Sequence, residues 1–303
     1  MPRWLTVGAA QSGPISRDES RPDVVDRLIA LLREGHKQGC QVVAFTEVAL
    51  TAFFPHWWIE DEEELDRWFE TEMPGSETQP LFDEAARLRI GFQLGYAELA
   101  IEGGKKRRFN SSVLVSPDGA IIGHFRKMHL PGHIEHRPHN PFQNLEHRYF
   151  ERGNLGFPTW EAFGGRMGMC ICNDRRWPET WRMLALAGAE LAFCGYNTPE
   201  HIPEHPHMEH LTAFHHQLCM QSAAYLNSLW IVGVAKTGVE EGVSQLGLTS
   251  IVSPSGQIVA QASTLEDELV VHRCDLELSA EYRRLFNYER NRRPEFYGFI
   301  ASH

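Results

Sequence analysis

The chain has 303 residues, of which 42% are hydrophobic and 23% charged, which is ordinary for a globular protein and long enough for one large domain or two. Its 29 basic and 40 acidic residues give a formal net charge of −11, which argues against nucleic acid or an anionic membrane surface as the main partner. No apolar stretch is long enough to span a membrane, residues 1–4 lead directly into a strand-like segment, and six irregularly spaced cysteines do not suggest a disulfide framework. We therefore expect a cytoplasmic protein in a reducing compartment.

The N-terminal segments alternate between strand and helix patterns. Residues 5–11 predict a buried strand, 20–38 an amphipathic helix, and 41–45 a near-continuous apolar strand. The last of these strands ends at Glu47, and open α/β sheets keep their functional sites at the carboxyl ends of such strands. Glu47 is therefore a candidate catalytic carboxylate.

A loop at residues 49–58 is unusually aromatic. Its large side chains follow neither helical nor strand periodicity, so we expect the loop to wall a pocket, although core packing is an alternative. These side chains are Phe53, Phe54, Trp57 and Trp58.

The next segments predict two helices and then a series of strands. The helices are expected at 62–73 and 78–88, and the strands at 92–101, 109–115 and 120–126. The basic run Lys105–Arg108 is interpreted as a solvated turn between the first two strands. The last strand ends at Lys127, which makes this lysine a candidate cation for a site at the sheet edge.

An apolar run at residues 167–171 predicts a strand that delivers Cys172 to a polar turn, and Pro178 begins the helix that follows. Backbone N–H groups and the positive end of a helix both favour a thiolate, so Cys172 is a candidate nucleophile. The alternative is a small buried side chain, which describes most free cysteines. Because alternate residues of a strand share a face, we expect Cys170 to pack close behind Cys172.

The C-terminal half continues with strands and one histidine-rich segment. A strand at 191–194 leads to Asn197 and Thr198, and the segment 201–216 carries six histidines. A zinc site is one interpretation of these histidines, but their spacing does not match a compact ligand set, so we do not predict one. The remaining predicted elements are a helix at 208–226, a strand at 229–235 and a hairpin at 248–260.

Two halves of the chain resemble each other. Residues 115–122 are similar to 252–259, and both halves contain a helix, a glycine and a strand that ends in phenylalanine. We therefore predict an α/β fold of two pseudo-repeated halves with mixed sheets, stacked sheet on sheet with helices outside. No linker separates the halves, so residues 1–303 are expected to form a single domain, with a tail from about 280 to 303 that packs on the body or on a partner subunit.

Glu47, Lys127 and Cys172 each follow a predicted strand in a separate part of the chain. If these strand ends converge, they supply an acid/base, a cation and a nucleophile, which suits acyl transfer from a carbon–nitrogen bond. A structural Glu–Lys pair beside a core cysteine is the alternative.

The motifs around these three residues resemble those of the nitrilase superfamily of carbon–nitrogen hydrolases. The resemblance runs from Thr6 to about Gly298, and within the superfamily the chain closely resembles the N-carbamoyl-D-amino acid amidohydrolases. The motifs that carry the resemblance are Phe45-Thr46-Glu47, Phe125 to Pro131, Cys172 to Glu179, Leu94 to Leu99, Glu70 to Gly75 and Gly195 to Pro199.

The resemblance implies a four-layer α-β-β-α sandwich, a homo-oligomer (dimer or tetramer), no cofactor, no metal, and a Glu47/Lys127/Cys172 triad with Glu146 as a second carboxylate. It also implies a set of substrate-binding residues, which are His129, Asn173, Arg175, Arg176, Asn197 and Thr198. Two positions depart from the family pattern, Asn144 where a histidine is usual and Cys170 where a bulky apolar residue is expected.

The expected activity is hydrolysis of a small molecule, an N-carbamoyl-D-amino acid, to the D-amino acid, ammonia and carbon dioxide through a carbamoyl group on Cys172. Another amidase of the superfamily, or a ureidopropionase-like enzyme, is the nearest alternative. A ligand-binding relative without activity and a zinc hydrolase are alternatives from other classes.

Overall fold

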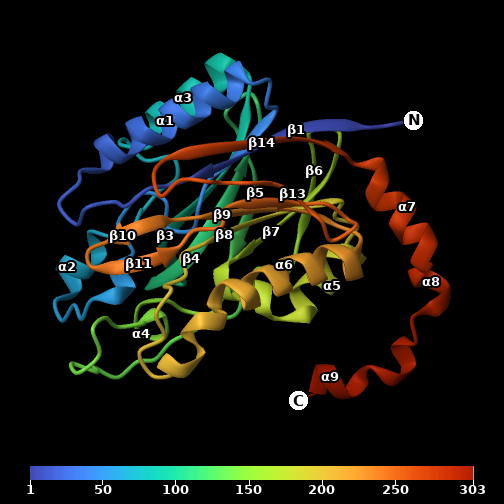
Figure 1. Ribbon diagram of the computed structural model, residues 1–303. Coiled ribbons are helices and arrows are strands. Elements are labelled where there is room, and N and C mark those ends of the chain that lie inside the picture. Colours follow the sequence, from blue (N-terminus) through green and yellow to red (C-terminus); the bar gives the residue numbers. More distant parts are fainter. Residues whose placement is uncertain (303) are drawn as a thin grey trace.

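The computed structural model describes residues 1–302. Within them, two six-stranded sheets stack face to face, and helices cover the outer face of each sheet (Figure 1). The covering helices are α1 (Arg21–Lys37) and α3 (Gln79–Leu88) on one side and α5 (Pro178–Leu186) and α6 (Thr212–Asn227) on the other. The predicted α-β-β-α sandwich is confirmed.

The first sheet has the strand order β14-β1-β2-β3-β4-β5, in which β1, β2 and β3 are parallel and the other neighbours antiparallel. Its strands are β14 (Glu268–Asp275), β1 (Trp4–Gln11), β2 (Val42–Ala44), β3 (Gly91–Glu102), β4 (Lys105–Val115) and β5 (Ile121–Arg126). Strand β14 was not predicted, because its residues are only partly buried at most positions and lack a clear alternation of apolar and polar side chains.

The second sheet has the order β13-β12-β9-β8-β7-β6, with β7, β8 and β9 parallel. Its strands are β13 (Ile258–Gln261), β12 (Ser250–Val252), β9 (Trp230–Ala235), β8 (Leu191–Tyr196), β7 (Gly165–Ile171) and β6 (Thr159–Ala162). A separate hairpin joins β10 (Thr237–Glu240) to β11 (Val243–Leu246). Both sheets therefore place parallel strands in the middle, with their carboxyl ends available for a site.

The local signals of the two halves produce matching turns. Ser116 N donates to Ala120 O at 2.9 Å between β4 and β5, and Ser253 N donates to Gln257 O at 2.9 Å between β12 and β13. The helices also begin where the sequence indicates, since the Ser20 side chain caps α1 by accepting from a backbone N–H of its first turn. The repeated sequence pattern thus corresponds to repeated structure.

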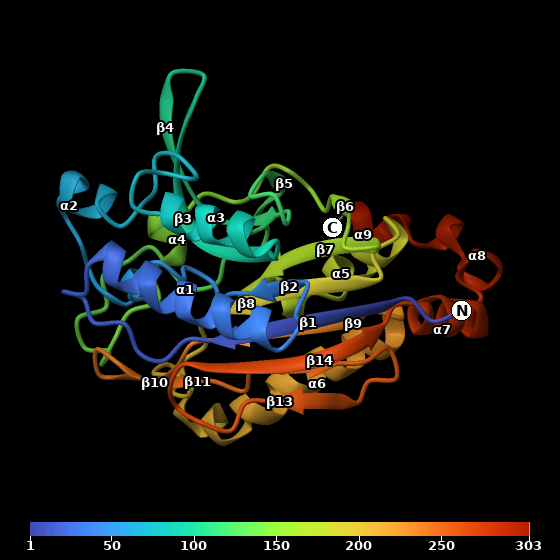
Figure 2. The same cartoon turned by 90° about the horizontal axis from the view of Figure 1, so that it is seen from above.

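Two predictions for the region 62–108 are wrong. The expected helix 62–73 ends at Asp66 as α2 (Glu62–Asp66), because the chain then bridges to β3, with Glu70 N donating to Ala97 O at 2.8 Å. The basic run belongs to β4 and not to a turn, since the β3–β4 turn is made at Gly103 and Gly104. Figure 2 shows this hairpin projecting from the body.

The C-terminal segment runs along one side of the molecule as α7 (Glu277–Phe286), α8 (Tyr288–Asn291) and α9 (Gly298–Ser302) (Figure 1). The first part of this segment contacts the body, because Ser279 Oγ donates to Glu190 O at 2.9 Å and Tyr288 Oη donates to Leu226 O at 2.6 Å. The described part of the chain has no helix with the length and apolar character to cross a bilayer. The remaining short helices are α4 (Glu146–Tyr149), η1 (Phe54–His56), η2 (Cys172–Arg176), η3 (Pro206–Leu211) and η4 (Pro294–Phe296).

Candidate active site

The structure brings the three predicted strand ends together. Glu47 follows β2, Lys127 follows β5, and Cys172 follows β7. Lys127 Nζ lies 2.7 Å from Glu47 Oε1 and 2.6 Å from Glu146 Oε2, and all four residues are buried. The residues named as triad and second carboxylate therefore form one compact cluster.

Two glycines make this convergence possible. A Cβ atom at Gly195 on β8 would lie 2.6 Å from the backbone nitrogen of Glu47, and one at Gly95 on β3 would lie 2.4 Å from Thr46 O. The segment that carries Glu47 thus passes between a strand of each sheet at a distance that only glycine permits.

The Glu47 carboxylate has two hydrogen-bond donors besides Lys127. Asn110 Nδ2 donates to Glu47 Oε1 at 2.7 Å, and the backbone N–H of Asn197 donates to Glu47 Oε2 at 2.8 Å. Asn110 was not predicted as a site residue, because its only sequence signal is a place in a strand motif. These bonds fix the carboxylate in a single orientation.

The cluster keeps Lys127 charged. Burial opposes the charge, but the carboxylates of Glu146 and Glu47 raise the pKa of Lys127 above its ordinary value. Burial also raises the pKa of Glu146 above its usual range, against the attraction of Lys127. Two of the three ammonium N–H donors are used by carboxylates, so the third remains for a substrate oxygen.

Cys172 is a thiol in the resting site, contrary to the expectation of a thiolate. Burial, and then the Glu47 carboxylate, raise the pKa of Cys172 to about 11, and the opposing effects of Lys127 and Arg175 are smaller. The sulfur lies 3.5 Å from Asn197 O, which a thiol can donate to. A neighbouring group must therefore remove the proton when the sulfur attacks.

The strand breaks at the nucleophile. Cys172 has a φ of 47°, a left-handed conformation, and β7 ends one residue before it. Cys170 and Cys172 therefore do not share a strand face, and the prediction that they do is wrong. Cys170 instead lies in register with Cys194 of β8, and burial together with Cys194 raises its pKa well above the ordinary value.

Asp174 joins two of the site segments, although it was not predicted to do so. This wholly buried carboxylate accepts from the backbone N–H of His129 at 2.9 Å, from His129 Nδ1 at 2.7 Å and from Ile171 N at 3.0 Å. The polar turn after the nucleophile is thereby tied to the segment that carries Lys127.

The two arginines after the nucleophile have different surroundings. Arg175 is buried, and it donates to Cys172 O at 2.7 Å and to Thr198 Oγ1 at 2.8 Å. Arg176 is exposed and donates to the neutral Asn173 Oδ1 at 3.3 Å. Among the side chains that the structure describes, no carboxylate pairs with either guanidinium.

A cavity of about 360 Å³ opens above the cluster. Of the predicted site residues, its lining includes Glu146, Cys172, Arg176, Asn197 and Thr198. The other predicted residues do not belong to this lining, namely Glu47, Lys127, His129, Asn173 and Arg175. The cavity therefore exposes the nucleophile together with one unpaired guanidinium.

The aromatic loop contributes one of its four expected side chains to the cavity. Phe53 lines it, together with His56, which was not predicted. Phe54, Trp57 and Trp58 are outside this lining and pack with other aromatic residues in an apolar cluster, which Phe53 also joins. Both interpretations of the loop thus hold, each for part of it.

The histidines of the segment 201–216 do not converge. His216 is buried with its Nε2 atom 3.1 Å from Tyr196 Oη, whereas His201 pairs with Glu209 on the surface. Within residues 1–302, no group of three or more His, Cys, Asp or Glu side chains is arranged to hold a metal ion.

We therefore expect hydrolysis to survive prolonged treatment with a chelator, because the site residues are a carboxylate, an ammonium and a thiol. The measurement is the initial rate before and after dialysis against EDTA, with a known zinc hydrolase as positive control. Loss of activity that added zinc restores would contradict this expectation and revive a metal role for the histidine segment.

Comparisons with known proteins show the family of the chain and its fold. A family model described as Carbon-nitrogen hydrolase matches residues 6–284. An N-carbamoylputrescine amidase of Arabidopsis thaliana is 27% identical over 90% of this chain and 88% of its own, and a citrullinase of Francisella tularensis is 29% identical over 64% of this chain and 65% of its own. The crystal structure of a carbon-nitrogen hydrolase from Helicobacter pylori G27 has a TM-score of 0.82 at 23% identity and covers 99% of both chains.

Proposed function

The chain belongs to the carbon-nitrogen hydrolase family, and from this premise we propose that it hydrolyses N-carbamoyl-D-amino acids to the D-amino acid, ammonia and carbon dioxide. The reaction class follows from the family and from the buried Glu47, Lys127 and Cys172 cluster. The substrate class follows from the surroundings of Arg176. The D configuration rests on the motif resemblance, and enantiomers test it directly.

One observation carries the choice of substrate. Arg176 is a guanidinium in the lining of the cavity that contains Cys172, and no described carboxylate neutralises it. The nearby Arg175 charge lowers the pKa of Arg176 to about 10, so the two cations repel each other. A substrate carboxylate would relieve this repulsion and match the planar fork of the guanidinium.

In the first step, the Cys172 sulfur attacks the ureido carbonyl carbon while Glu47 takes the thiol proton. The free N–H of Lys127 donates to the oxygen that becomes negative, and the burial of Lys127 strengthens this interaction. The bond from carbon to the amino-acid nitrogen then breaks, and Glu47 returns its proton to that nitrogen. A carbamoyl thioester on Cys172 remains.

In the second step, water attacks the thioester carbonyl and Glu47 takes a proton from the water. The carbon–sulfur bond breaks, the proton restores the thiol, and carbamic acid leaves and decomposes to ammonia and carbon dioxide. Glu146 contacts Lys127 at 2.6 Å throughout, so it holds the ammonium in place while Glu47 changes its protonation.

The relatives support a ureido group as the reacting group. One is named for carbamoylputrescine and another for citrulline, and both of these compounds contain a terminal ureido group. Carbamoylputrescine also carries an amine, whose positive charge would meet Arg176 in this cavity. A carboxylate-bearing ureido compound therefore fits the charges better.

Asn144 offers a contact for the carbamoyl group. Its Oδ1 atom is buried, its side chain belongs to the cavity lining, and the atom has no hydrogen-bond partner within residues 1–302. If the side chain turns towards the cavity, a carbamoyl N–H can donate to this oxygen and compensate for the histidine usual at this position in the resembling family.

The proposed function is tested with a panel of N-carbamoyl D- and L-amino acids, N-carbamoylputrescine, and simple amides. We expect the highest kcat/KM for a member of the D series, with release of ammonia measured directly. Faster hydrolysis of carboxylate-free amides would identify a general amidase, and no turnover of any compound would favour a ligand-binding protein.

We expect Arg176→Ala to lower kcat/KM for N-carbamoyl amino acids about ten- to hundredfold, because a charge-assisted contact with the substrate carboxylate is lost. The same change should scarcely affect a carboxylate-free analogue. The measurement is kcat/KM for both substrates in each variant.

Arg137→Ala is the matched control, because Arg137 is a second guanidinium in the cavity lining but is already paired with Glu204. Arg137→Ala should change kcat/KM to the same extent for the N-carbamoyl amino acid and for the carboxylate-free analogue. Equal losses for both substrates in the Arg176 variant would show that Arg176 does not bind the carboxylate.

A further inference from the structure

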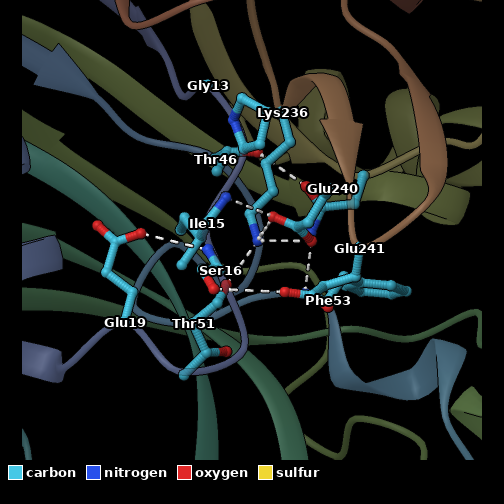
Figure 3. Close-up of polar contacts among 12 residues, drawn as sticks. Gly13, Ile15, Ser16, Glu19, Thr46, Thr51, Phe53, Lys236, Glu240 and Glu241 are labelled. Atoms are coloured by element: carbon cyan, nitrogen blue, oxygen red, sulfur yellow. Dashed lines mark hydrogen bonds and ion pairs between the residues drawn. The ribbon is translucent and has the colours of Figure 1, made fainter.

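A second buried ion pair lies outside the Glu47–Lys127–Cys172 cluster (Figure 3). Lys236 follows β9, and Glu240 ends β10. Their side chains are 0% and 2% exposed, and Lys236 Nζ lies 2.9 Å from Glu240 Oε2. No step of the proposed reaction uses either residue.

Each charge of this pair also binds the backbone of another segment. Lys236 Nζ donates to Thr51 O at 2.5 Å. Glu240 Oε1 accepts from the backbone N–H of Phe53 at 2.7 Å, and Glu240 Oε2 accepts from that of Ile15 at 3.1 Å (Figure 3). The aromatic loop is therefore held at two of its backbone positions by one ion pair.

The part of the loop that is held forms a wall of the catalytic cavity. The Phe53 ring packs against His56 at a centroid distance of 4.9 Å, and His56 packs against Phe142 at 5.0 Å. All three rings belong to the cavity lining, as does Cys172. Burial, and then the Lys236 charge, lower the pKa of His56 to about 3, so the wall is neutral.

The hairpin that carries Glu240 also holds a second part of the cavity lining. Leu246 N on β11 donates to Thr198 O at 2.8 Å, and Glu200 N donates to Ser244 O at 2.9 Å. Thr198 belongs to the cavity lining. The position of Phe53 relative to Thr198 therefore depends on where this hairpin is anchored.

We propose that the Lys236–Glu240 pair is a positioning element that sets the width of the catalytic cavity through the backbone N–H of Phe53, and so determines the size of the substrate side chain accepted. The aromatic wall favours apolar or aromatic side chains. The choice of test substrates rests on the proposed function, but the positioning role does not.

Stability alone is a weak explanation for such a pair. Two charges lose their hydration on burial, and apolar replacements of similar volume are often as stable or more stable. Glu240, by contrast, accepts two backbone N–H groups that belong to different segments. A role in fixing those segments accounts for the position of both charges.

Two charge-neutral double variants separate the roles. Lys236→Met with Glu240→Gln removes both charges but keeps a carbonyl oxygen that can accept from Phe53 N. Lys236→Met with Glu240→Leu removes both charges and the acceptor at nearly the same volume. The readout is the ratio of kcat/KM for N-carbamoyl-D-phenylalanine to that for N-carbamoyl-D-alanine.

We expect the Gln variant to keep the parent ratio and the Leu variant to change it at least about tenfold, mainly through KM, as expected when an apolar pocket changes by about one methylene. Unchanged ratios in both folded variants would overturn the proposal and leave the pair a structural feature. Equal losses for both substrates would overturn it too, because they would indicate an effect on the chemistry.

If either double variant fails to fold, Glu240→Asp provides the test, because it keeps the charge balance but shortens the reach to Phe53 N. An unchanged ratio in this variant would overturn the proposal. Arg27→Met with Asp267→Asn is the control for general destabilisation, since this ion pair is outside the cavity lining. It should keep the parent ratio.

A readout without turnover separates this proposal from the proposed function. The rates at which iodoacetamide and N-phenyl iodoacetamide alkylate Cys172 also compare a small with a large group in the same cavity. If the parent hydrolyses no N-carbamoyl amino acid, the proposed function fails, while a shifted ratio of alkylation rates in the Leu variant still supports the positioning role. A ratio that stays at the parent value would refute it.

Discussion

Cys172→Ala should lower kcat by about four orders of magnitude or more, the scale seen when a nucleophile that acts as part of a unit is removed. The expectation rests on the position of Cys172, buried at the end of β7 and in the lining of the cavity. Substrate binding should persist, because the variant keeps Arg176 and the cavity wall. Turnover and equilibrium binding of a radiolabelled substrate measure the two effects separately.

Cys170→Ala is the matched control, since Cys170 is also a buried free cysteine but lies within β7, in register with the free Cys194 of β8. It should keep most of the activity. In the parent enzyme, mass spectrometry of a digest should locate the adduct of a slow substrate or of iodoacetamide on Cys172. An adduct found on Cys170 instead, or substantial activity in Cys172→Ala, would show that the nucleophile is misassigned.

Glu47→Gln is expected to lower kcat at least about 100-fold, because the amide cannot take the thiol proton or return it to the leaving nitrogen. A resting thiol with a pKa of about 11 makes this transfer necessary near neutral pH. Glu84→Gln is the control, since Glu84 is also a salt-bridged carboxylate but lies on α3, outside the site, and its variant should keep full activity.

The pH dependence of Cys172 alkylation also tests the assignment of Glu47 as the base, because Glu47→Gln should lose turnover but have a more acidic thiol. In the parent the Glu47 charge raises the pKa of the thiol, whereas Lys127 and Arg175 lower it. Removing the carboxylate charge therefore lowers the pKa, and the alkylation rate of Glu47→Gln should rise at a lower pH than that of the parent. Slower turnover together with a more acidic thiol would identify Glu47 as the base. A midpoint that stays the same or moves upward would contradict this account.

The C-terminal half shows what local sequence signals can determine. The apolar run before Cys172 and the proline after it predict a strand and a helix with a turn between them, and β7 and α5 have these bounds within one or two residues. The turn at Ser253, and the matching turn at Ser116 in the N-terminal half, lie between the predicted strands for the same reason. Periodicity, caps and turn residues act over a few neighbouring positions, so they can be recognised without the rest of the fold.

The order of three strand ends, each with a residue suited to one role, was also available from the sequence. Whether these strand ends converge could not be determined from the sequence. It depends on Gly195 and Gly95, which let the segment with Glu47 pass between strands of the two sheets. A glycine in a sequence indicates freedom of the backbone, but not which distant segment will approach it.

The properties of the site depended on the tertiary structure. Complete burial beside Glu47 reverses the expected shift in the pKa of Cys172, because desolvation and a like charge outweigh the nearby cations. Packing also assigns Arg175 to the backbone of the nucleophile turn and leaves Arg176 in the cavity. The sequence alone therefore determined the elements, their order and the types of reacting groups, whereas charge states and partners were decided by segments that meet only in the folded chain.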